Sequence, residues 1–92
     1  MGKFKNKLTE DIAGGEVVKG LSPALVRKAM IKIILVMAAA DLKDLRIPSS
    51  NHLEKLKGDR QEQYSIRVND KYRICFEWEN NEATEIEFID YH

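Results

Sequence analysis

Residues 64–91 read YSIRVNDKYRICFEWENNEATEIEFIDY and contain the clearest structural pattern of the chain. Apolar and polar side chains alternate along 64–68, 72–78 and 84–91, a pattern typical of strands with one buried face. The polar stretches VNDKY and ENNEA separate these segments and indicate hairpin turns. The alternation therefore predicts an antiparallel sheet. Its core face would carry Tyr64, Ile66, Val68, Tyr72, Ile74, Phe76, Trp78, Ile86 and Phe88.

The opposite face of the predicted sheet is expected to stay open and to bring two arginines together. A three-residue loop at 69–71 sets Arg67 opposite Arg73, and a similar register for the next hairpin sets Arg73 opposite Tyr91. Two hypotheses explain the arginine pair: an anion such as phosphate lies between them, or each arginine pairs with a nearby glutamate. The predicted open face consists of Ser65, Arg67, Arg73, Cys75, Glu77, Glu85, Glu87, Ile89 and Tyr91.

The first half of the chain has a helical period. A first helix is predicted over 8–18, although the glycines in AGG at 13–15 weaken or break it. Ser22 as N-cap and Pro23 at the first helical position begin a second helix, which should run to about Ala40. With a further short strand in HLEKL, the order predicts an α+β domain with N-terminal helices packed on one face of a small antiparallel sheet.

The length of 92 residues predicts a single domain over 1–92 with a thin core. Lys plus Arg number 15, as do Asp plus Glu, so no bulk charge indicates a nucleic-acid or membrane partner. The longest apolar run, at 29–40, is shorter than the roughly 20 residues that a membrane helix needs. A single cysteine, Cys75, fits a reducing compartment, and its expected role is that of a small half-exposed sheet residue. These features favour a cytoplasmic protein.

The second predicted helix is apolar nearly all the way round between Ala29 and Ala40, whereas a surface helix normally has a polar face. Two explanations stay open. Either the first helix covers Ile31, Leu35 and Met37, or these side chains meet a partner chain. His52, His92 and the lone cysteine do not form a zinc spacing, and no phosphate-loop or dinucleotide motif is present, so no metal or cofactor is expected.

The stretch LRIPSSNHLEKLKGDRQEQYSIRVNDKYRICFEW at 45–78, followed by DYH at 90–92, resembles the HigB-type branch of the RelE/ParE toxin superfamily. The resemblance implies a fold like that of RelE and the microbial ribonucleases, and a bacterial toxin of a type II toxin–antitoxin system. Such toxins enter the ribosomal A site and cut mRNA, using the RNA 2′-hydroxyl as nucleophile. The implied partner is a HigA-type helix-turn-helix antitoxin, and operator DNA would be bound only through it.

The resemblance also implies site residues. Lys57 would bind phosphate, Arg73 would stabilise the charge that develops at phosphorus, and Tyr91 would position or stack on a base. His92, with Asp90, would move protons.

One departure from the family pattern concerns Glu54, where some members have a histidine. Two assignments stay open: Glu54 is the base and His92 the acid, or the roles are shared differently.

Further RNA contacts are expected from basic residues before the last hairpin. Arg67 follows from the alternation alone, and Lys55, Arg60 and Lys71 belong to the same basic stretch, which is either a phosphate-binding patch or a solvated surface of mixed charge. The near-zero net charge is unusual for a ribosome-bound toxin. It keeps an alternative open, namely a non-enzymatic ParE-like toxin that binds gyrase.

Overall fold

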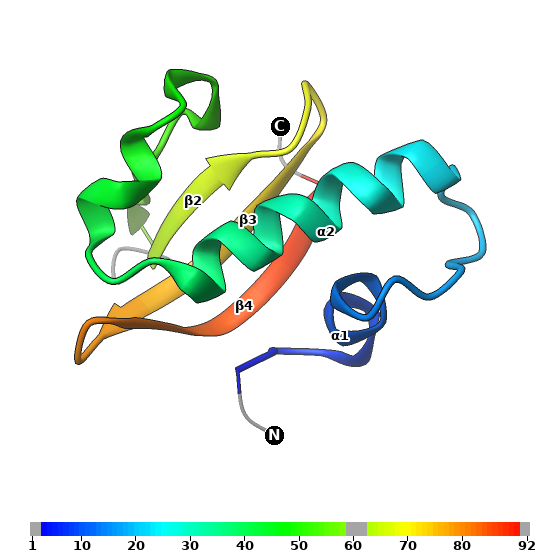
Figure 1. Cartoon of the computed structure of the whole chain (residues 1–92), viewed down its shortest axis with the longest axis horizontal. Helices are drawn as coiled ribbons and strands as arrows, with labels where there is room; N and C mark the ends of the chain where they lie inside the picture. Colours follow the sequence, from blue (N-terminus) through cyan, green and yellow to red (C-terminus); the bar gives the residue numbers. More distant parts are fainter. Residues whose placement is uncertain (1–2, 59–62, 91–92) are drawn as a thin grey trace.

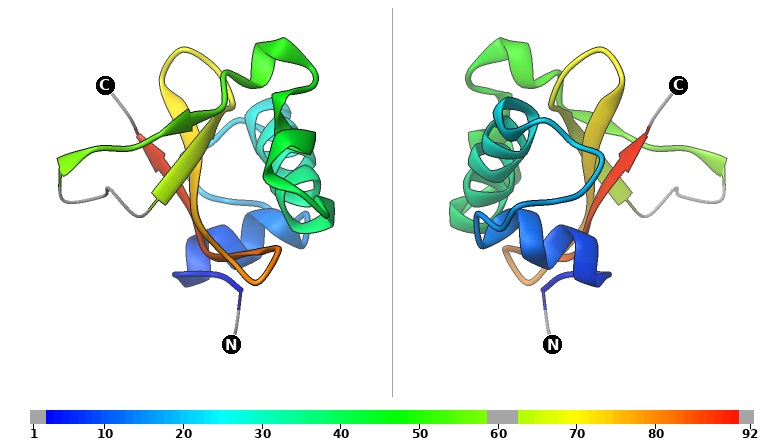
Figure 2. Two further views of the ribbon diagram at one scale, coloured as in Figure 1. Left: turned by 90° about the vertical axis from the view of Figure 1, so that its left-hand side faces the viewer. Right: turned by 90° about the vertical axis from the view of Figure 1, so that its right-hand side faces the viewer.

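Two helices cover one face of a four-stranded sheet in the computed structural model, which describes residues 3–58 and 63–90 (Figures 1 and 2). The strand order is β1-β2-β3-β4 and each neighbouring pair is antiparallel, which confirms the predicted α+β class. The elements are helices α1 (Lys7–Ala13) and α2 (Pro23–Ala38), the 3-10 turns η1 (Leu42–Arg46) and η2 (Ser49–Asn51), and strands β1 (Glu54–Lys55), β2 (Gln63–Arg67), β3 (Tyr72–Glu79) and β4 (Glu82–Asp90).

Helix α1 is short because its glycines end it. The Asn6 side chain accepts a hydrogen bond from the Thr9 amide at 2.9 Å and caps the first turn. The helix ends at Ala13, and Gly15 follows with a φ of 76°, in the left-handed region that favours glycine. Of the two effects that the sequence left open for the AGG stretch, the structure shows the second: AGG breaks the helix, which therefore does not continue to Val18.

Helix α2 begins where the sequence predicts. The Ser22 hydroxyl accepts a hydrogen bond from the Leu25 amide at 3.1 Å, and Pro23 occupies the first turn. The helix ends at Ala38, two residues before the predicted Ala40. Its buried side faces the sheet and consists of Val26, Ala29, Ile33 and Val36.

Replacing Ser22 by alanine is expected to lower the free energy of unfolding by about 1 kcal/mol, because the Leu25 amide loses its capping oxygen. Urea denaturation followed by circular dichroism measures the change. Ser50→Ala serves as the control, since Ser50 is exposed in η2 and caps no α-helix. Equal shifts in the two variants would contradict the capping role.

The register of β2 and β3 is the predicted one, with Arg67 opposite Arg73. The predicted register of β3 and β4 was wrong: Arg73 lies opposite Ile89, not Tyr91. The reason is a two-residue turn at 80–81, where both asparagines have positive φ, followed by a bulge at Glu85 with a φ of 51°. The turn and the bulge together shift the pairing by two residues from the predicted one.

The main core lies between the sheet and the helices. Six of the nine predicted core residues are buried, whereas Tyr64, Tyr72 and Trp78 lie at its margin and are partly exposed. Tyr72 stacks on Phe88 with ring centroids 4.8 Å apart, which extends the core to the end of the sheet where β3 begins. The helices add Ile12, Val26, Ala29, Ile33 and Val36.

The second face of the sheet is not open at its centre, which corrects the sequence prediction. Ser65 and Cys75 are fully buried, and Arg73 is only 8% exposed. The chain that leads from η2 into β1 accounts for part of this burial, because the carbonyl of His52 receives a hydrogen bond from Arg73. Strand β1 projects on the side of the sheet away from α2 (Figure 2). Cys75 is therefore a buried thiol and not a half-exposed one.

Candidate functional site

A cluster of polar and charged side chains lies on the sheet face away from α2. We call it the arginine face and define it by the register positions of Glu54, Ser65, Arg67, Arg73 and Glu87. One row of paired residues runs from Glu54 through Ser65 and Cys75 to Glu87 across all four strands. The neighbouring row holds Arg67, Arg73 and Ile89. Side chains that are paired in this way point to the same side of a sheet.

Arg73 is held in place by groups from two separate segments. Its Nε donates to the Ser65 hydroxyl at 2.8 Å, and its Nη2 donates to the carbonyl of His52. A buried charge is costly unless hydrogen bonds compensate it, and a guanidinium fork donates in fixed directions. The side chain is therefore oriented before any ligand arrives.

Arg67 is more exposed, and its partner differs from the nearby glutamate that one of the two hypotheses named. Its guanidinium pairs with Asp70 in the β2–β3 loop, and not with a glutamate. The Arg67 and Asp70 side chains are 37% and 95% exposed, so water screens the pair and the pair adds little stability. An anion that binds beside Arg67 would therefore displace Asp70 at small cost.

Asn51, which the sequence analysis did not single out, directly precedes His52 and anchors the segment that carries it. Its side chain is fully buried, and its amide group donates to the carbonyls of Leu45 at 3.1 Å and Ile47 at 3.4 Å. The ammonium of Lys32 on α2 donates to its side-chain oxygen. Burial, and then the nearby charge of Lys28, lower the pKa of Lys32 below its ordinary value.

The sequence signal for this segment is the turn-forming composition of PSSN at 48–51. The burial of Asn51 and its contact with Lys32, 19 residues earlier, could not be predicted from local pattern. Ser65 appeared in the alternation only as a face residue, and its hydrogen bond to Arg73 was not foreseen.

Not every predicted site residue reaches the arginine face. Asp90 lies opposite Tyr72 at the end of β4, and its carboxylate is 3.9 Å from the ammonium of Lys71. Asp90 therefore points to the helix side of the sheet, because paired residues share a side and Tyr72 packs against the main core. Lys55 pairs with Tyr64 and so points to the same side as Asp90.

The remaining predicted residues lie partly within the described chain and partly outside it. Glu54 is exposed within β1, and Lys57 is exposed two residues after this strand. Arg60, Tyr91 and His92 lie outside the described residues. Lys71 is 5.5 Å from the centre of the Tyr72 ring, at the sheet edge.

Within residues 3–58 and 63–90, histidine, cysteine, aspartate and glutamate side chains do not gather in groups of three that could hold a metal ion. The helices in this part of the chain lack the length and apolar character needed to cross a membrane.

Comparisons with known proteins agree with the resemblance in the motifs. A family model described as the RelE-like toxin of the type II toxin–antitoxin system HigB matches residues 3–92. Toxin HigB-1 of Vibrio cholerae is 35% identical over 77 residues, which cover 83% of this chain and 81% of that protein. An uncharacterized protein of Haemophilus influenzae is 41% identical over 61 residues, which are 66% of this chain and 59% of that protein's length. The chain therefore belongs to the family of HigB-like, RelE-like toxins.

Proposed function

We propose that this chain is the toxin of a type II toxin–antitoxin pair and an endoribonuclease that cuts mRNA in the ribosomal A site, in the cytoplasm. The observation that carries the proposal is Arg73, a guanidinium oriented by Ser65 and the His52 carbonyl beside a second arginine. Such a pair matches the oxygens of a phosphodiester. Family membership supports the same assignment.

The proposed reaction is an internal transesterification of the RNA. A base takes the proton of the 2′-hydroxyl, its oxygen bonds to the adjacent phosphorus, and the bond to the 5′-oxygen breaks. The products are a 2′,3′-cyclic phosphate and a 5′-hydroxyl, which receives a proton from an acid. Arg73 and Arg67 would neutralise the charge that develops on the phosphate oxygens.

The protein groups are assigned in keeping with the geometry. Glu54 is the base in this proposal, because it is exposed and its register partner Ser65 binds Arg73. His92 is the general acid and Tyr91 stacks on a nucleobase of the RNA, as the family resemblance implies. Lys57 and Arg60 would hold the RNA backbone beyond β1.

Two residues receive a lesser role because of where they lie. Asp90 stands opposite Tyr72 and close to Lys71, so in this proposal it ties the end of β4 rather than moving protons. Lys55, on the same side as Asp90, would contact rRNA at most and not the scissile phosphate.

Mapping of RNA 5′ ends after induction in bacteria tests the proposal. The wild type is expected to produce new 5′-hydroxyl ends inside codons of translated mRNA and to arrest growth. A variant that lacks Tyr91 and His92 is expected to do neither while remaining folded by circular dichroism. Equal growth arrest by the folded truncated chain would remove both residues from the site. DNA damage without new RNA ends would instead support a ParE-like action on gyrase.

The proposal includes an antitoxin of the HigA type, a helix-turn-helix protein that inhibits the toxin and carries the complex to operator DNA. The toxin itself would contact that DNA only through the antitoxin. Co-expression with the protein of the adjoining gene is expected to restore growth, and co-purification of the two proteins is the direct measurement.

A further inference from the structure

Helix α2 has a second apolar face, which the rest of the described chain leaves exposed. Figure 1 shows α2 lying across the sheet with no other described helix or strand in front of it. The exposed large side chains are Ile31 at 50%, Ile34 at 49%, Met37 at 40% and Leu35 at 36%. Helix α1 does not cover Ile31, Leu35 or Met37, which answers the question that the sequence left open. A small monomer seldom exposes several large apolar residues on one helix.

The charges on α2 are all of one sign. Arg27 and Lys28 are exposed at the N-terminal end of the same face, and Lys32 lies beside it. The helix contains no aspartate or glutamate between Pro23 and Ala38. The exposed face of α2, defined by Arg27, Lys28, Ile31, Ile34 and Leu35, is therefore basic at one end and apolar along the rest.

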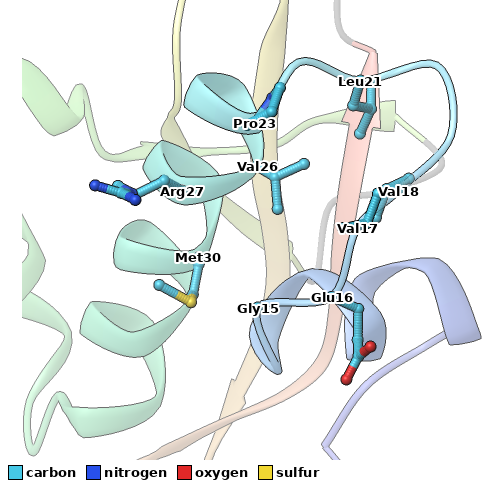
Figure 3. A pocket seen from close by; sticks show the side chains of 9 residues that line it. All are labelled: Gly15, Glu16, Val17, Val18, Leu21, Pro23, Val26, Arg27 and Met30. Atoms are coloured by element: carbon cyan, nitrogen blue, oxygen red, sulfur yellow. The ribbon is translucent and has the colours of Figure 1, made fainter.

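A hollow of about 240 Å³ lies next to this face, between α2 and the chain that connects α1 to it (Figure 3). Val26, Met30 and Val18 line its wall together with the acidic Glu16, and Arg27 belongs to both the hollow and the exposed face. Val17, which is 97% exposed, also lines it. An apolar side chain of a partner that lies along α2 could enter this hollow.

We infer that the exposed face of α2 is the docking surface for an acidic amphipathic helix of the antitoxin. An amphipathic helix that packs along this face presents apolar side chains at i, i+3 or i+4, and i+7, which would match Ile31, Ile34 and Leu35. Its acidic residues would lie against Arg27 and Lys28, because this face offers cations and no carboxylate. The inference rests on the antitoxin part of the proposed function, and not on RNA cleavage.

A second copy of the chain fits this surface less well. Two such faces packed together would bring two sets of cations into one interface with no acid from either helix. Neither copy would then supply the carboxylates that could pair with Arg27 and Lys28. The charge pattern therefore favours a different, acidic partner.

The test replaces Ile34 by glutamate and uses Ile47→Glu as the matched control. Both side chains are exposed, Ile47 at 78%, but Ile47 lies between η1 and η2 and outside the face. Binding to the purified protein of the adjoining gene is measured by calorimetry. Ile34→Glu is expected to weaken binding roughly 100-fold, and Ile47→Glu by less than about twofold. Circular dichroism melts establish that each variant is folded.

A second variant tests the sign of the charge. Arg27→Glu with Lys28→Glu is expected to slow association and to flatten its dependence on salt. Faster association would mean a basic partner and would overturn the inference. The inference would also be overturned if Ile34→Glu bound the partner protein with wild-type affinity. It would be overturned as well if Ile34→Glu changed only the self-association of the toxin, measured by sedimentation, since the occupant of the face would then be a second copy.

These outcomes are separate from those of the proposed nuclease. Calorimetry requires no RNA, so an Ile34-dependent complex without new RNA ends would leave the docking surface in place and remove the nuclease. If the toxin produces new RNA ends but its binding to the antitoxin does not depend on Ile34, the nuclease would stand and the docking surface would be overturned. No binding of the wild type at all would overturn the docking surface.

Discussion

Arg73→Lys is expected to reduce RNA cleavage by about 10²–10³-fold, which would abolish growth arrest. Lysine keeps the positive charge but loses the planar fork, so it cannot bind both the Ser65 hydroxyl and the His52 carbonyl as arginine does. The remaining charge would no longer be aimed at the phosphate. The measurement is the rate at which new RNA ends appear in a reconstituted translation reaction with purified toxin.

The same substitution also affects stability, and this effect has to be separated from catalysis. A buried acceptor that loses its donor costs about 1–3 kcal/mol, so the variant is assayed at a temperature where circular dichroism shows it to be fully folded. Arg67→Lys is the matched control, because Arg67 lies directly opposite but makes an exposed pair with Asp70. Its unfolding free energy should change by less than about 0.5 kcal/mol. A folded Arg73→Lys protein that cuts at the wild-type rate would remove Arg73 from the reaction.

The strands and the main core were predictable because a single physical signal determines them. Alternation with a period of two residues fixes which side chains face the helices, and Ile66, Ile74 and Phe76 are buried as this signal requires. The β2–β3 register follows because the connecting loop is short. Helix α2 was predictable at its N-terminus because Ser22 and Pro23 are both strong start signals.

The prediction of the β3–β4 register was wrong because two local signals had to be combined. Asn80 and Asn81 both tolerate a positive φ, which favours a two-residue turn and sets Glu79 opposite Glu82. Continued without interruption, that register would pair Phe76 with Glu85 and so oppose core and outer side chains. A one-residue bulge at Glu85 restores the alternation, so the sequence does contain the information, although not in any single motif.

The candidate site was predictable in its residue types but not in its burial. The alternation placed Arg67 and Arg73 opposite each other, as the structure has them. It could not show that the chain around His52 folds back onto Arg73, because that contact joins residues 21 positions apart. Contacts of this kind depend on how an irregular segment packs, and periodicity carries no information about irregular segments.

Asn51→Ala is expected to lower the free energy of unfolding by about 2 kcal/mol, because the carbonyls of Leu45 and Ile47 lose their donor. For a domain of this size, the melting temperature would fall by about 8–16 °C. Ser50→Ala, in the same 3-10 turn but exposed, should change it little. Thermal denaturation of the two purified variants measures the difference.

Asn51→Ala is also expected to reduce RNA cleavage by about tenfold or more in the folded protein, because a 1 Å misplacement in a supporting segment is costly in catalysis. The path of the effect runs from Asn51 through the His52 carbonyl to Arg73. This path makes a further prediction for a double-mutant cycle. If Asn51 acts by positioning Arg73, Asn51→Ala should slow cleavage far less in the Arg73→Lys background than in the wild type, although it still lowers stability in both. If Asn51→Ala reduces the cleavage rate by the same factor in both backgrounds, Asn51 only supports the fold, since a purely structural residue acts independently of the group at position 73.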